Sequence, residues 1–169
     1  MTNEEKINAW FANFQYRMEK EVPDIVAETA TAFFRETFVK QSWDGKPWQP
    51  LSAKYAAKKT RGAGRILRQS GNLEASIRPS EVNGNRVVIS AGNQNVPYAR
   101  VHNEGLRVAG TRNVRPYTNS NFMGKRKPVA IKAHTRTVNY IMPKRQFMGH
   151  SQFLNKALIE KLVNAFNTK

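Results

Sequence analysis

The stretch SIRPSEVNGNRVVISA, residues 76–91, decides the fold class of this chain of 169 residues. Asn83-Gly84 is the strongest short-range signal for a β-hairpin, because both residue types tolerate the positive φ angles of a tight two-residue turn. The run 86–91 that follows the turn is rich in β-branched residues, as strands are. We therefore predict an antiparallel hairpin over residues 76–91.

Helical periodicity flanks this hairpin on both sides. Apolar residues recur at helical spacing over 4–20 and over about 151–166. Between them, a second helix is expected to start at Pro23, a favoured first-turn residue, and to end near residue 40. The apolar stripes of these helices predict a core, made of Trp10, Phe14, Phe33, Phe34, Leu154, Leu158 and Leu162.

Shorter elements fill the middle of the chain. Residues 41–50 are expected to form a turn, and a short helix over 51–59 follows a Ser52 cap. A helical turn is predicted near 70–76, and a further short helix or turn over 97–104 that stops at Gly105.

The stretch 106–130 has no clear period, six Lys or Arg residues and two prolines, and is predicted to be a long exposed loop. Residues 129–142 alternate loosely and predict one or two strands. The fold class is therefore α+β, with N-terminal and C-terminal helices packed on a small antiparallel sheet and a long basic loop. We expect one domain over 1–169. Its parts are a helical region 1–40, a core 41–149 and a C-terminal helix 150–169.

Charge is distributed unevenly along the chain. The formal net charge is +16, yet residues 1–36 carry seven acidic and four basic side chains. Residues 37–149 carry 21 basic side chains against four acidic ones. This imbalance favours a polyanion or an acidic protein surface as a neighbour.

The absence of cysteine excludes disulfides and thiolate metal sites, and no apolar run reaches the length of a membrane span.

Nothing in the sequence predicts a catalytic, cofactor or metal site. His102, His134 and His150 are scattered and have no metal-ligand spacing, and the acidic residues of the middle are equally dispersed. RGAGR at 61–65 lacks the ending of a phosphate-binding loop. The charge by itself allows a nucleic-acid-binding protein, and an enzyme such as a nuclease is a further alternative.

Two basic clusters are the candidate contacts to a partner or to DNA, because Lys and Arg bind phosphate without a fixed motif. The candidate residues are Lys58, Lys59, Arg61, Arg65, Lys125, Arg126 and Lys127. Contact with an acidic protein is preferred over contact with DNA. Charges at the rim of such an interface would steer assembly and set its register.

Four segments together resemble the virion morphogenesis or tail-completion family of Mu-like phages, which is similar to the head–tail joining proteins of siphophages. They are DGKPWQPL at 44–51, ILRQSGNLEASI at 66–77, PYARVHNEG at 97–105 and PKRQFMG at 143–149. The residues that match the family motifs are Asp44, Gly45, Trp48, Leu51, Gly71, Leu73, Ser76, Ile77, Tyr98, His102, Gly105, Arg145, Phe147 and Gly149. The basic stretch 106–142 is a departure, because the family usually has a shorter connection there.

The resemblance implies a structural, non-enzymatic component of the virion, located at the neck or tail end and present in the host cytoplasm during assembly. It implies a homo-oligomeric ring that completes the tail or joins it to the head. The implied partners are further copies of the chain, neighbouring neck, connector or tail-terminator proteins and packaged DNA, with no membrane. The motif residues, His102 included, would then be fold residues.

Overall fold

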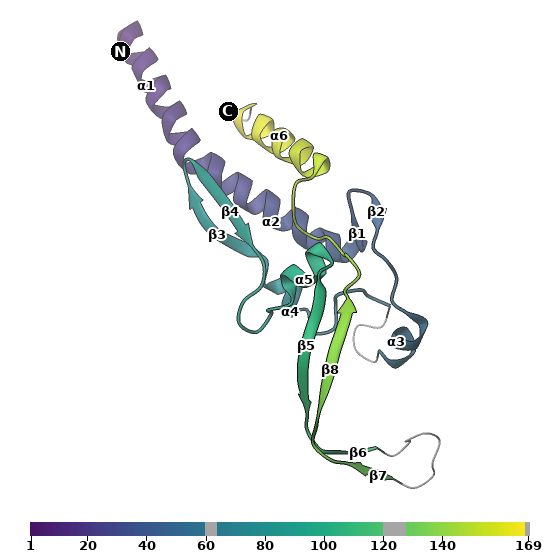
Figure 1. Cartoon of the computed structure of the whole chain (residues 1–169). Coiled ribbons are helices and arrows are strands. Elements are labelled where there is room, and N and C mark those ends of the chain that lie inside the picture. The colour runs from purple at the N-terminus through teal and green to yellow at the C-terminus, as the bar shows by residue number, and fades with distance from the viewer. Residues whose placement is uncertain (60–63, 120–127, 168–169) are drawn as a thin grey trace.

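A computed structural model describes the chain at residues 1–59, 64–119 and 128–167. Its most prominent feature is a long helical rod at the N-terminus (Figure 1). The rod consists of α1 (Asn3–Tyr16), a π-helical turn η1 (Arg17–Glu21) and α2 (Val22–Lys40). At its start, the Thr2 hydroxyl accepts a hydrogen bond from the Glu5 amide at 3.2 Å, and the Glu5 carboxylate accepts one from the Thr2 amide at 2.7 Å. This capping box satisfies amides that have no partner within the helix.

The rod is continuous where the sequence predicts a new helix at Pro23. A proline inside a regular helix lacks a donor and clashes with the carbonyl four residues back. Here Pro23 is the second residue of α2, and the wider turn of η1, which ends at Glu21, changes the backbone geometry just before it. The rod ends at Gln41, whose φ of 51° is left-handed.

The four remaining helices are short except the last. They are α3 (Ala53–Lys58), α4 (Asn72–Ala75), α5 (Ala99–Glu104) and α6 (Gln152–Asn167). The predicted Ser52 cap is present, since the Ser52 hydroxyl accepts from the Tyr55 amide at 3.3 Å. α6 returns along α2, so the two terminal helical regions pack on each other. Among the described residues, none of the helices is both long and apolar enough to cross a membrane.

Every described strand pair is antiparallel, and each sheet has two strands. β1 (Ser42–Trp43) pairs with β2 (Lys46–Pro47), and β3 (Arg78–Asn83) pairs with β4 (Arg86–Ser90). The second pair is the hairpin predicted around Asn83-Gly84, and it lies along the rod. The α+β class predicted from the sequence is therefore confirmed.

The prediction of a long loop over residues 106–130 is wrong for most of the described residues in that range. β5 (Arg107–Val114) pairs along its whole length with β8 (His134–Ile141), and β6 (Tyr117–Asn119) pairs with β7 (Val129–Ile131). Together they form a projecting ribbon, which we call the arm (Figure 1). The arm carries few apolar residues because both of its faces are largely exposed, so the alternation that marks a half-buried strand is weak.

The core lies where α2, α6 and the motif segments meet. Its most deeply buried side chains are Phe38, Phe147, Leu73, Ile77 and Val96. Of the predicted core, Phe34 and Leu154 are buried, and Phe33, Leu158 and Leu162 are half-buried. The prediction is wrong for Trp10 and Phe14, which are 60% and 42% exposed, because α1 extends beyond the body of the protein.

Candidate assembly surfaces

The motif segments that are far apart in the sequence are fastened together by hydrogen bonds. Arg145, only 6% exposed, donates to the carbonyls of Gln49 and Pro50 at 3.0 and 3.3 Å. The Trp48 indole donates to the Gln146 carbonyl at 2.6 Å. A guanidinium stays charged in a protein and must have its donors satisfied when buried, so these contacts give Arg145 a place in the fold.

Asn103 makes a junction that sequence reasoning missed. Its side-chain oxygen accepts hydrogen bonds from the amides of Phe147 and Met148 at 2.9 and 3.0 Å. These bonds hold Phe147 in the core, where its ring centroid lies 5.2 Å from that of Phe38. In the motif Asn103 occupies a variable position, so no residue pattern marks it.

Two serine hydroxyls tie further parts of the chain to the same body. Asp44 accepts a hydrogen bond from the Ser151 hydroxyl, and that hydroxyl accepts from the Leu154 amide at 3.2 Å, which caps α6. The Ser76 hydroxyl donates to the Leu73 carbonyl at 2.7 Å and accepts from the Gly92 amide at 2.9 Å. Both hydroxyls therefore connect a turn to a neighbouring segment.

Gly105 has a conformation and a site that favour glycine. Its φ of +72° is left-handed, and a Cβ atom there would lie 2.7 Å from the Cβ atom of Lys144. Gly45 and Gly71 also have left-handed φ angles, but a Cβ atom on either would meet nothing within 4 Å. Two other motif residues differ in their surroundings. Leu51 is half-buried against the core, whereas Gly149 is exposed and has a φ of +144°.

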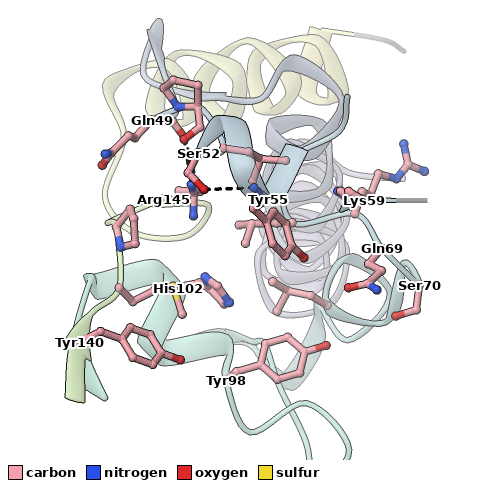
Figure 2. A pocket seen from close by; sticks show the side chains of 17 residues that line it. Gln49, Ser52, Tyr55, Lys59, Gln69, Ser70, Tyr98, His102, Tyr140 and Arg145 are labelled. Carbon is pink, nitrogen blue, oxygen red and sulfur yellow. Dashed lines mark hydrogen bonds between the residues drawn. The ribbon is translucent and has the colours of Figure 1, made fainter. Parts of the chain in front are cut away.

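A cleft of about 1030 Å³ opens between the body formed by the motif segments and the base of the arm (Figure 2). Tyr98, His102, Tyr140 and Arg145 line it, and the rings of Tyr98 and His102 meet edge to face at 5.8 Å. Nδ1 of His102 is buried and has no hydrogen-bond partner among the described residues. Burial, and secondly the charge of Arg145, lowers the pKa of His102 below its usual value, so the imidazole is held neutral.

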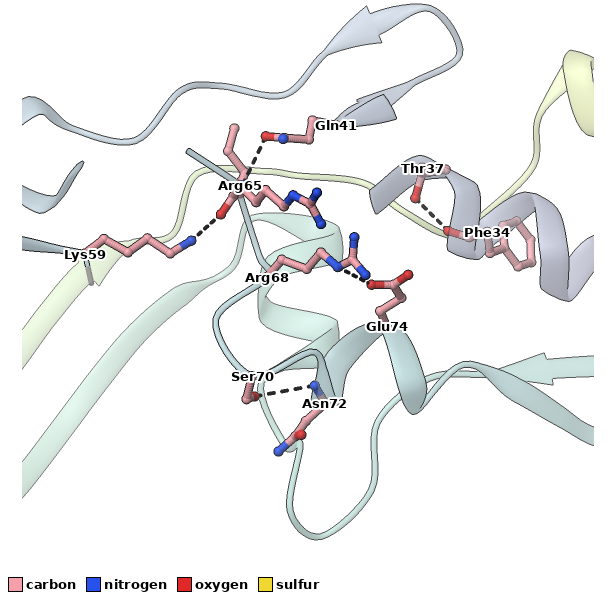
Figure 3. A network of polar contacts seen from close by, with 10 residues as sticks. Phe34, Thr37, Gln41, Lys59, Arg65, Arg68, Ser70, Asn72 and Glu74 are labelled. Carbon is pink, nitrogen blue, oxygen red and sulfur yellow. Dashed lines mark hydrogen bonds and ion pairs between the residues drawn. The ribbon is translucent and has the colours of Figure 1, made fainter. Parts of the chain in front are cut away.

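The predicted basic contacts are only partly brought together. Lys58 and Arg65 are exposed, and the half-buried Lys59 ammonium donates to the Arg65 carbonyl at the edge of the cleft (Figure 3). Burial lowers the pKa of Lys59. Nearby, Arg68 forms an ion pair with Glu74 at 2.7 Å. The other four candidates lie outside the described residues: Arg61, Lys125, Arg126 and Lys127.

The arm carries basic residues that sequence reasoning did not single out. Arg112 in β5 is the register partner of Arg136 in β8, and Arg115 and Lys132 lie at the bend of the ribbon. No Asp or Glu occurs in the sequence between Glu104 and Glu160. The absence of acidic residues from this basic region is the signal that could have pointed to Arg112 and Arg136. It identifies them as a pair only when the two strands are placed opposite each other.

The α1 helix lies at the opposite end of the molecule from the arm (Figure 1). Its aromatic side chains Trp10, Phe11 and Phe14 are exposed. Trp10 stacks on Phe14 at 5.5 Å, and Phe14 lies 5.9 Å from Phe166 of α6. Arg17 covers the Phe166 ring at 4.4 Å and donates to the Ala165 carbonyl at 2.6 Å. Beyond these contacts the aromatic stripe faces solvent.

The molecule thus has a body held together by hydrogen bonds between its motif segments, with α1 projecting at one end and the arm at the other. Residues 1–59, 64–119 and 128–167 contain no group of three metal-ligating side chains. Comparisons with curated proteins and with solved structures give no significant match. The family model of the phage virion morphogenesis family matches residues 4–167, a span that includes all four motif segments and both projecting ends. The chain therefore belongs to the phage virion morphogenesis family.

Proposed function

We propose that this virion morphogenesis protein is a structural subunit of the phage neck or tail end, and that its copies form a ring that completes the tail or joins it to the head. The observation that carries the proposal is the exposed aromatic stripe of α1. Trp10 and Phe11 are 60% and 59% exposed on a helix that makes few contacts with its own chain. Burying one such side chain contributes about 1.5–3 kcal/mol, so a neighbouring copy that covers the stripe would stabilise the assembly.

The shape of the molecule supports a subunit role. A body fastened by motif hydrogen bonds carries the N-terminal rod at one end and the arm at the other (Figure 1). Two different projecting surfaces allow each copy to contact two neighbours. Contacts between unlike surfaces generate rings when the rotation between copies closes.

The motif side chains support a structural role rather than a reaction centre. Asp44 holds Ser151, and Arg145 holds the carbonyls of Gln49 and Pro50, so each motif side chain fastens another segment of the chain. A catalytic carboxylate or serine would lie in a cleft where a substrate could reach it, and neither Asp44 nor Ser151 lines the cleft described above.

The second candidate function is DNA binding, which the opposed Arg112 and Arg136 favour. If the arm binds packaged DNA, the purified protein should bind duplexes of unrelated sequence equally. Its log affinity should then fall with log salt by about 0.9 per phosphate contact. The double substitution Arg112→Glu and Arg136→Glu removes two phosphate contacts. The slope should therefore become shallower by about 0.9 for each of them.

Loss of the gene in the phage that encodes the chain tests the proposal. Without the protein, we expect filled heads and separate tails, or tails that end abruptly, in electron micrographs of the lysate. Supplying the chain from a plasmid should restore joined, infectious particles. Electron cryomicroscopy of those particles should show a ring of this chain at the neck or tail end. Normal particles in its absence, or a location in the capsid shell, would refute the proposal.

A further inference from the structure

Two arginines face each other across the arm without a counter-charge. Arg112 and Arg136 are register partners in β5 and β8, so their side chains lie on the same face of the ribbon. Both are exposed, and neither has a carboxylate within 4.0 Å in the described part of the chain. Like charges directly opposite each other destabilise a strand pair. An anionic group lying over this pair would therefore stabilise the arm.

The face that carries the arginine pair continues into the cleft. Side chains alternate between the faces of a strand, so the register pair Val108 and Tyr140 shares the face of Arg112 and Arg136. Tyr140 lines the cleft, and Val108 is half-buried beside it. A partner on this face thus meets apolar and aromatic side chains at the cleft and two guanidinium groups further out. A DNA backbone would use only the guanidinium groups, whereas a protein helix would use both.

The chain itself supplies a surface of the opposite chemistry. Asp24 and Glu28 lie four residues apart on one side of α2 and are exposed. Neither has a basic partner within 4.0 Å among the described residues. On α1, the same rod exposes Trp10 and Phe11. The rod therefore offers carboxylates together with aromatic rings.

The geometry points to a head-to-tail contact in which the arm and cleft of one copy hold the N-terminal rod of the next copy. The rod and the tip of the arm project from opposite ends of the molecule, so the contact joins different copies (Figure 1). The guanidinium pair suits the carboxylates of the rod, and the apolar and aromatic side chains of the cleft suit its rings. This inference rests on the proposed ring and names the two surfaces that build it.

Charge exchange tests the contact in the assembled particle. Arg112→Glu with Arg136→Glu, and separately Asp24→Arg with Glu28→Arg, should each reduce incorporation of the chain into particles by about tenfold or more, because like charges then face each other. The chain with all four substitutions should recover incorporation to within about twofold, because opposite charges are restored. The urea midpoint of each purified variant should stay near that of the unmodified chain, since all four sites are exposed.

Failure to rescue would overturn the contact. If the four-substitution chain is incorporated no better than the two-substitution chains, the arm and the rod do not meet. If the arm variant alone loses incorporation and also loses DNA affinity, the anionic partner of the arm is DNA. If all variants enter particles normally, the contact is wrong while the ring at the neck stands. If the unmodified chain is missing from particles, the proposed function itself fails.

Cross-linking gives an independent readout because the chain has no cysteine. A chain with Asp24→Cys and Arg136→Cys, treated with a bis-maleimide linker in purified particles, should give a ladder of covalent multimers. Each single-cysteine chain should give no species beyond a dimer. The control pair Lys46→Cys with Arg136→Cys places one cysteine in the exposed strand β2, beyond the other end of α2, and should give no ladder. A ladder from the control alone would overturn the inference.

Discussion

Replacing Phe38 by Ala should destabilise the body far more than any change in the exposed stripe of α1. Phe38 is 0% exposed, and its ring centroid lies 5.4 Å from that of Trp48 and 5.2 Å from that of Phe147. A buried Phe→Ala change costs about 3–5 kcal/mol through the transfer free energy of the removed atoms and the cavity left behind. Because the substitution also removes two aromatic ring pairs, we expect a value of about 4–5 kcal/mol, a large part of the ~5–15 kcal/mol of a typical domain.

The assay is urea unfolding at low protein concentration, in which tryptophan fluorescence monitors the transition. Trp48 reports directly because it packs against the substituted ring. The matched control is Phe11→Ala, the same chemical change at a side chain that is 59% exposed. The control should alter the free energy of unfolding by less than about 0.5 kcal/mol. Equal effects at both positions, or a destabilisation below about 1 kcal/mol for Phe38→Ala, would refute the division into a packed body and a projecting helix.

Three more predictions concern the junctions of the body. Asn103→Leu removes the acceptor of two amides and should cost about 2–6 kcal/mol in urea unfolding, whereas a neutral result would show that water replaces it. Gly105→Ala should cost more than Gly71→Ala, because both have left-handed φ angles but only Gly105 also meets Lys144; equal costs would contradict the close approach. The fold lowers the pKa of His102, so its contribution to stability is present above about pH 6.5 and is lost as the pH falls below that value. The difference in urea midpoint between pH 7.5 and 5 should therefore shrink in His102→Gln; an unchanged difference would assign the pH dependence to other groups.

The local elements were predictable because their signals are local. The Asn83-Gly84 turn, the Ser52 cap and the left-handed stop at Gly105 each depend on residues within a few positions. The motif residues were also recognisable as a set. Their contacts were not, because the Arg145 guanidinium binds carbonyls 95 and 96 residues away in the sequence.

The arm could not be predicted for a related reason. A strand that is exposed on both faces has no strong alternation of apolar and polar residues, so its pairing is invisible until the partner strand is placed. Arg112 and Arg136 become a pair only through the register of β5 and β8. The sequence predicted the basic charge of this region, and the pairing of distant strands determined where two of its charges meet.

By itself, the sequence determined the segregation of acidic and basic charge, the two terminal helical regions and the hairpin at residues 76–91. It also determined that α1 has an apolar stripe, since helical spacing alone places those side chains on one side. Only the tertiary structure decided which stripe is buried. Phe34 packs inside because α6 and the motif segments cover α2, whereas Trp10 stays exposed because none of the described segments covers α1 there. An apolar stripe requires a partner, and whether that partner is the same chain or another copy depends on contacts between residues that are distant in sequence.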